Sequence, residues 1–139
     1  MQPTDHLDAE GAGARAAWRV SEADVAIYLT FVECLARGGS TSTARRFLAP
    51  GFIEHGEVRD RDGTELLDCL SARSAQAPDE DWAIDLLVSV GGLVVCHSST
   101  TARLSTACAS RAREIVIARI TAGRIAECWR VCDDPRLSR

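Results

Sequence analysis

The chain has 139 residues, 46% of them hydrophobic, which suits a single folded domain with a core of its own. Its 16 basic residues are all arginine and are outnumbered by 20 acidic residues, which leaves a net charge of −4. That balance provides no basic face able to neutralise many phosphates, so we expect no nucleic-acid partner. No apolar run approaches the ~20 residues that cross a bilayer, so we expect no membrane anchor.

The six cysteines are scattered along the chain without a CxxC pair, and no secretory signal precedes them. We therefore expect reduced thiols, no metal site and a cytoplasmic protein. Residues 1–20, which contain glycines and several alanines among acidic residues, are expected to form a flexible arm. A single domain over 21–134 and a polar tail over 135–139 complete the predicted organisation.

Three helices are predicted in the first half of the chain. Ser21 can cap a helix over 21–37, which carries apolar residues at helical spacing and is followed by Gly38-Gly39. Shorter helices are predicted over 42–48, which Pro50-Gly51 would end, and from Thr64 to a point before Pro78.

From Trp82 onward the apolar residues recur with a period of two, which is typical of β-strands. Glycines at 91–92 and at 123 indicate tight turns between consecutive strands. A turn is predicted over 60–63 and a loop over 104–110. The predicted extended segments are 52–55, 82–90, 93–101, 111–120 and 124–132.

Helices first and a meander of long antiparallel strands afterwards predict an α+β fold, with three helices packed on one face of a curved, mostly antiparallel sheet. The alternation over 82–90 places one set of residues on a common face, namely Trp82, Ile84, Leu86, Val88 and Val90. The last two strands are apolar on both faces, and the helices can cover only one of those faces. We therefore expect a homodimer formed through the other face.

Three motifs, in this order, resemble the SnoaL-like branch of the nuclear transport factor 2-like, or ketosteroid isomerase-like, superfamily. They are RFLAPGFIEH at 46–55, DGTELL at 62–67 and GRIAECW at 123–129. The resemblance covers about residues 21–134 and implies a cone-shaped α+β barrel whose helices and strongly curved sheet enclose an apolar pocket. Relatives include polyketide cyclases, ketosteroid isomerases, dehydratases and an epoxide hydrolase, which work without metal or organic cofactor. The resemblance therefore implies no cofactor and a small hydrophobic ligand.

The chain departs from the pattern of this family at three positions. The residue after the tryptophan of the terminal strand is usually an aspartate that acts as general acid or base, whereas this chain has Arg130. Val116 stands where some relatives present a histidine to the pocket, and Glu54 stands where the cyclases have an asparagine. The usual catalytic site is therefore reorganised or lost in this chain.

The first catalytic candidates are His55, at the motif histidine of the family, and its neighbour Glu54. In an extended segment these side chains point to opposite faces, so only one of them enters the pocket, and we favour His55. Arg130 is expected on the pocket face, where a lone buried charge would cost several kcal/mol. It therefore needs a bound anion or a carboxylate, the candidates being Glu54, Asp85 and Asp133.

Arg130 can act as a clamp for a developing oxyanion, or it can belong to a purely structural ion pair. His97 is a further catalytic candidate because imidazole titrates near neutral pH, although a lone strand histidine is also typical of a core or interface position. Asp85 interrupts an apolar strand in the same way, and its alternative is a solvated position on the outer face. The residues expected to contact a ligand in the implied pocket are Phe52, Trp82, Val116 and Cys128.

We expect a cofactor-independent enzyme of cyclase, isomerase or dehydratase type that moves a proton next to a carbonyl group of a small hydrophobic, polyketide-like substrate. A histidine or a carboxylate would take the proton while Arg130 stabilises the charge on oxygen. The alternative is a non-catalytic protein that binds a ligand in the pocket or serves as a dimeric scaffold, because the family aspartate is absent. Epoxide hydrolysis is a further alternative.

Overall fold

The computed structural model describes residues 21–36, 40–76, 80–103 and 109–133. Its helices are α2 (Glu22–Ala36), α3 (Thr41–Arg45) and α4 (Gly63–Gln76). Its strands are β1 (Leu48–His55), β2 (Asp60–Asp62), β3 (Asp81–Val90), β4 (Leu93–Arg103), β5 (Ala109–Thr121) and β6 (Arg124–Cys132). The predicted arm, the predicted tail and residues 104–108 of the predicted 104–110 loop lie outside the described residues. The last two residues of that predicted loop belong to β5 instead. No helix in the described ranges is long and apolar enough to cross a membrane.

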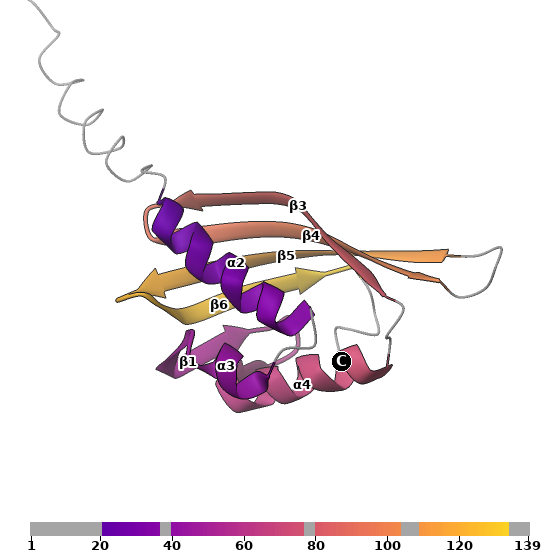
Figure 1. Ribbon diagram of the computed structural model, residues 1–139, viewed down its shortest axis with the longest axis horizontal. Helices are drawn as coiled ribbons and strands as arrows, with labels where there is room; N and C mark the ends of the chain where they lie inside the picture. The colour runs from indigo at the N-terminus through magenta and orange to yellow at the C-terminus, as the bar shows by residue number, and fades with distance from the viewer. Residues whose placement is uncertain (1–20, 37–39, 77–79, 104–108, 134–139) are drawn as a thin grey trace, which may run out of the picture.

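The six strands form one curved, unclosed sheet in the order β2-β1-β6-β5-β4-β3 (Figure 1). β1 runs parallel to β6, and the other neighbouring pairs are antiparallel. Figure 1 shows α2 lying across the long strands and α3 and α4 beside β1. The predicted α+β fold, with helices on a mostly antiparallel sheet, is confirmed. We call the helix-covered side of the sheet the inner face and the opposite side the outer face.

The core lies between the inner face and the helices. Alternate residues of the long strands face the helices and are buried, as the period of two requires. They join aromatic residues of α2 and leucines of α4 in one hydrophobic cluster. Its members include Tyr28, Phe31, Phe52, Leu66, Leu67, Val94, Cys96, Val116, Ala118 and Cys128.

A bulge in β3 changes which of its residues face the helices. The pairing of β3 with β4 shifts between Ile84 and Leu86, so the alternation of side chains reverses after Asp85. Leu87 packs against the core and Ser89 is 1% exposed, whereas Leu86 is 51% exposed on the outer face. The predicted common face of this strand is therefore wrong beyond the bulge, because a strict period of two assumes that no residue is inserted.

Two segments before α4 also differ from the prediction. The predicted turn over 60–63 is wrong, because its first three residues form β2, in which Arg61 pairs with Glu54 of β1. All three residues of β2 are charged, so hydrophobic periodicity could not indicate a strand there. α3 ends at Arg45, earlier than predicted, and Leu48 already belongs to β1.

The turn between β5 and β6 places one residue in an unfavourable backbone conformation. Gly123 has a φ of 76°, and Ala122 before it has a φ of 51°. Two consecutive positive φ values are typical of a type I′ turn, which fits the twist of a two-residue hairpin. The predicted turn at Gly123 is confirmed, while Ala122 bears a strain on the order of 1 kcal/mol, because its Cβ atom disfavours this region.

Replacement of Ala122 by asparagine should stabilise the protein by about 0.5–1 kcal/mol, because asparagine adopts the left-handed region more readily than alanine. The urea midpoint, measured at one protein concentration, should rise while the m-value stays constant. Thr121→Asn is the matched control: the same side chain one residue earlier enters β5, where asparagine is unfavourable, and should not stabilise. A lower midpoint for Ala122→Asn would contradict the strain at this turn.

Candidate active site

Four charged side chains follow one another across the inner face. Arg61 on β2, Glu54 on β1, Arg130 on β6 and Glu114 on β5 come from strands that are neighbours in that order. Their charges alternate in sign along this line. We call these four residues the charged row.

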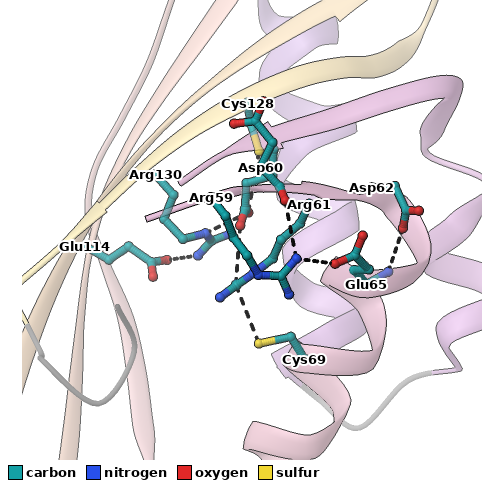
Figure 2. Close-up of polar contacts among 10 residues, drawn as sticks. Arg59, Asp60, Arg61, Asp62, Glu65, Cys69, Glu114, Cys128 and Arg130 are labelled. Atoms are coloured by element: carbon teal, nitrogen blue, oxygen red, sulfur yellow. Dashed lines mark hydrogen bonds and ion pairs between the residues drawn. The ribbon is translucent and has the colours of Figure 1, made fainter. Parts of the chain in front are cut away.

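Arg130 joins the two carboxylates of the row. Its Nε donates to Oε2 of Glu54 at 2.8 Å, and its Nη1 donates to Oε1 of Glu114. On the other side, Nη1 of Arg61 lies 3.6 Å from Oε1 of Glu54 and also 3.6 Å from the thiol of Cys69 on α4. Figure 2 shows Arg130 directed at Glu114 and Arg61 close to Cys69. The row is therefore one connected network that reaches from β5 to α4.

The row is largely removed from water. The side chain of Glu54 is 1% exposed, and those of Arg61, Arg130 and Glu114 are 15%, 17% and 15% exposed. Burial alone would lower the pKa of Arg130, but the carboxylates of Glu114 and Glu54 outweigh it and hold that pKa well above its ordinary value. Two cations and two anions balance, and such pairing is what makes ionised groups tolerable at low exposure.

The two carboxylates of the row differ in what they can still bind. Oε1 of Glu54 faces Arg61, and its Oε2 accepts from Arg130, with the thiol of Cys128 at 3.7 Å. Glu114 uses only Oε1, and its Oε2 has no hydrogen bond or ion pair within the described part of the chain. Ser98 lies opposite Glu114 on β4 and is 4% exposed. Among the described residues, Glu114 is thus the carboxylate of the row that has an oxygen without a partner.

Tyr28 of α2 adds a proton donor near the row. Tyr28 is buried, and the pKa of its hydroxyl responds to Cys96, Arg130 and Glu114. Burial raises the pKa of Tyr28 well above its ordinary value, and the opposing effect of Arg130 is smaller. Burial also raises the pKa of Cys96 to about 11 and that of Cys128 further. The phenol and both thiols therefore stay protonated at neutral pH.

His55 points to the outer face, away from its chain neighbour Glu54. Its Nε2 lies 2.8 Å from Oε2 of Glu127, and its Nδ1 lies 3.3 Å from Oδ1 of Asp60. The ring stacks on Trp129, with 5.3 Å between ring centroids. The expectation that His55 rather than Glu54 faces the pocket side is wrong, because strand alternation admits one of the two and the buried guanidinium pairs with the carboxylate.

His97 and Asp85 also lie on the outer face, at the bulge of β3. Nδ1 of His97 is 3.7 Å from Oδ2 of Asp85, and the hydroxyl of Ser99 donates to the same oxygen. Nη2 of Arg111 donates to Oγ of Ser99 at 3.0 Å. Asp85 is therefore not the partner of Arg130, and the sheet separates His97 and Asp85 from the charged row.

The four residues expected to contact a ligand lie on the inner face. Phe52, Val116 and Cys128 belong to the core and are 4%, 3% and 4% exposed. Trp82 is half-buried and pairs with Thr100 of β4. Their contact with a ligand stays a prediction, as do the catalytic roles of the five candidates named from the sequence.

Three residues of the site are not among the candidates predicted from the sequence. Glu114 could have been found, because it alternates on its strand with Val116, which occupies a family pocket position. Arg61 lies in the segment that the sequence predicts to be a turn. Tyr28 fits the apolar stripe of its helix, and no local signal separates a tyrosine that packs from one that also serves a polar site.

The described residues include no group of three or more His, Cys, Asp and Glu side chains placed to hold a metal ion. Cys69 is the exposed thiol among the five free cysteines of these residues, and Cys96 and Cys128 are buried.

Known structures share the fold of this chain at low sequence identity. AclR from Streptomyces galilaeus, provisionally described as a hydroxylase, has a TM-score of 0.69 at 16% identity over 82% of this chain and 83% of its own. IdmH from Streptomyces antibioticus, provisionally described as a polyketide cyclase, has a TM-score of 0.69 at 20% identity, over 79% of this chain and 91% of its own. A provisionally assigned polyketide cyclase from Acidithiobacillus ferrooxidans has a TM-score of 0.67 at 18% identity, over 86% of this chain and 94% of its own. At these identities the likeness establishes the fold alone.

No protein with a curated description matches the chain. The family model described as SnoaL-like polyketide cyclase matches residues 26–139, which include α3, α4, all six strands of the described structure and all of α2 except its first four residues. Motifs, fold and family model agree, and the chain belongs to the SnoaL-like polyketide cyclase family.

Proposed function

We propose that this protein is a cofactor-independent enzyme of cyclase or isomerase type that transfers a proton on a small hydrophobic carbonyl compound of polyketide-like chemistry. Membership of the SnoaL-like polyketide cyclase family supports the reaction class. The observation that carries the proposal is Arg130, held on the inner face between Glu54 and Glu114, with one oxygen of Glu114 left for another partner. A positioned carboxylate beside a fixed cation is the pair that enolate chemistry needs.

Glu114 is the general base in this mechanism. Its Oε2 takes the proton from the carbon next to the carbonyl group, and the C–H electron pair moves into the enolate. Arg130 uses Nε and Nη1 for its carboxylates, and within the described residues its Nη2 has no such partner. Nη2, together with the protonated phenol of Tyr28, stabilises the enolate oxygen. Glu114 then returns its proton after the carbon skeleton has cyclised or the double bond has moved.

This assignment also explains how the chain can keep the reaction class without the usual aspartate. Relatives carry the acid or base directly after the tryptophan of the terminal strand, where this chain has Arg130. The neighbouring strand β5 supplies Glu114, whose Cα lies opposite Cys132, two residues beyond Arg130. The carboxylate is thus displaced to the next strand, and the position that it leaves carries the compensating cation.

A second candidate is a protein that binds a hydrophobic ligand without turnover. The observation in its favour is that Arg130 already has two carboxylate partners, so the row is charge-balanced without any substrate. His55 and His97, which would supply neutral-pH proton transfer, lie on the other face of the sheet. This candidate predicts ligand binding but no loss or gain of protons from carbon.

We also propose that two copies associate through the outer face. Four residues of β3, β4, β5 and β6 are paired side by side there, and we call them the outer strip: Leu86, His97, Ile115 and Val131. Leu86 is 51%, Ile115 46% and Val131 56% exposed, which is unusual for three large apolar side chains in one strip. A second copy of the same strip would cover them, and His97 would then be an interface residue.

The enzyme proposal predicts that the wild-type protein accelerates deuterium uptake next to the carbonyl of a small apolar ketone such as 2-tetralone in D2O. Glu114→Gln should reduce this acceleration by roughly 10²-fold or more, because the base is lost while the amide oxygen still accepts from Arg130. Proton NMR of the ketone measures the rate, with the uncatalysed rate subtracted.

Glu65→Gln is the matched control, since Glu65 is a carboxylate on α4 that pairs with Arg59 and is 43% exposed. It should exchange the ketone at the wild-type rate. Equal rates for Glu114→Gln and wild type would rule out Glu114 as base. Saturable binding of the ketone without any exchange by the wild type would support the ligand-binding candidate instead.

The dimer proposal predicts that Ile115→Arg raises the dimer dissociation constant by about 30-fold or more, because a charge then enters the centre of the outer strip. Val58→Arg is the control, since Val58 is 73% exposed on the connection between β1 and β2, away from the strip. Sedimentation velocity over a dilution series measures both constants. A wild-type chain that is monomeric at micromolar concentration would overturn the proposal.

A further inference from the structure

An outer-face cluster lies directly behind the charged row. We call it the His55 clamp, and it consists of His55 on β1, Asp60 on β2, and Glu127 and Trp129 on β6. Nε2 of His55 is 2.8 Å from Glu127 and Nδ1 is 3.3 Å from Asp60, so both ring nitrogens face carboxylate oxygens. The clamp therefore ties both neighbours of β1 to it.

The geometry of the clamp requires a charged imidazole. Ionised carboxylates only accept hydrogen bonds, and a neutral imidazole donates from one nitrogen while presenting a lone pair on the other. Only the imidazolium donates to Asp60 and Glu127 at once. The hydrogen bond to Glu127, followed by that to Asp60, raises the pKa of His55 above its ordinary value, and the same bond lowers the pKa of Glu127.

Three of the four members of the clamp are next in sequence to a member of the row. His55 follows Glu54 on β1, Asp60 precedes Arg61 on β2, and Trp129 precedes Arg130 on β6. The cross-strand pairs agree, because Glu54 pairs with Arg61 while His55 pairs with Asp60 and with Trp129. Since β2 has only three residues at the edge of the sheet, its ladder is short and the side-chain ties on both faces matter for its position.

We propose that the imidazolium of His55 is a positioning residue, which holds β2 and β6 against β1 from the outer face and thereby keeps Arg61 and Arg130 aligned on Glu54. When His55 loses its proton, one of its two ties becomes a contact between a lone pair and a carboxylate oxygen, and the alignment loosens. The inference rests on the proposed function only in assigning catalysis to the charged row.

The charged groups around His55 set the direction of its pH dependence. Asp60 faces it from β2 and Glu127 from β6, and Arg119 of β5 donates to the other oxygen of Glu127 at 3.0 Å. The guanidinium of Arg119 also lies 5.5 Å from the ring centre of Trp129. Because the pKa of His55 is raised on folding, its tie is complete below the ordinary value of 6.5 and is lost as the pH rises through the folded pKa.

An isolated surface ion pair contributes little to stability, so the clamp must be distinguished from a local pair without effect on the row. The hydrogen bond from Nε of Arg130 to Glu54 provides the distinguishing signal, because it lies on the other face of the sheet. The exchange of this Nε–H with solvent, relative to its intrinsic rate at each pH, reports how firmly the bond is held.

The experiment follows the Arg130 Nε–H and the His55 imidazole by nitrogen-15 NMR in the same sample between pH 5.5 and 8.5. Arg130→Lys identifies the Nε–H signal by its loss. In the wild type, the protection of this Nε–H should fall roughly ten-fold with the same midpoint as the titration of His55. In His55→Gln the protection should already be low at pH 5.5 and show no such step.

Asp60→Asn makes the test independent of losing the histidine. It removes one carboxylate charge from the clamp, so the pKa of His55 and the midpoint of Nε–H protection should move together to lower pH. If the clamp were not coupled to the row, Asp60→Asn would shift the pKa of His55 but not the midpoint of Nε–H protection. Glu65→Gln, which breaks the exposed pair with Arg59, should leave both unchanged.

Equal protection in wild type and His55→Gln, or a protection midpoint that ignores the shift in Asp60→Asn, would overturn the inference. The ketone exchange rate of the same variants separates it from the proposed function. Protection that follows His55 in a protein without ketone exchange keeps the positioning role and removes the enzyme proposal. Ketone exchange in a protein whose Nε–H protection does not depend on pH keeps the enzyme proposal and removes the positioning role.

Discussion

The burial of Arg130 is the constraint on which the candidate site depends. A guanidinium does not give up its proton, so it needs negative partners wherever the fold removes it from water. β6 lies between β1 and β5, and the planar fork lets Nε reach Glu54 on one neighbour while Nη1 reaches Glu114 on the other. A lysine at this position would present one ammonium on a flexible stem and would not join two strands in fixed directions.

This network also accounts for how distant parts of the chain meet. Glu54 and Arg130 are 76 positions apart, and the parallel pairing of β1 with β6 brings them together. A parallel pair needs a long crossover, and here α4 and the strands from β2 to β5 all lie within it. The charged row is complete only when β1 and β6, the first and last strands in chain order, have paired. No local sequence motif can therefore form it.

Local patterns predict much of this fold, because apolar periodicity acts over many residues and tolerates single exceptions. The need of Arg130 for a carboxylate is also predictable, since the cost of a lone buried charge is large. The orientation of β1 is not predictable in this way. Strand alternation places Glu54 and His55 on opposite faces, but it does not determine which of these faces the helices cover. The predicted faces of β3 are wrong for another reason. One inserted residue at Asp85 reverses the alternation of side chains, and the residue types around it do not indicate a bulge.

The alternation of strands also separates two kinds of polar chemistry. The inner row carries balanced charges at low exposure, and a group that exchanged a proton with solvent there would leave an uncompensated charge, which costs several kcal/mol. His55 sits one residue away from Glu54 but on the outer face, with 32% of its side chain exposed, where it can exchange protons with solvent. A change in its charge leaves the inner balance intact and reaches the row only through the backbone that the two faces share. Consecutive residues of one strand can therefore have different roles: Glu54 keeps a fixed charge on the inner face, and His55 responds to pH on the outer face.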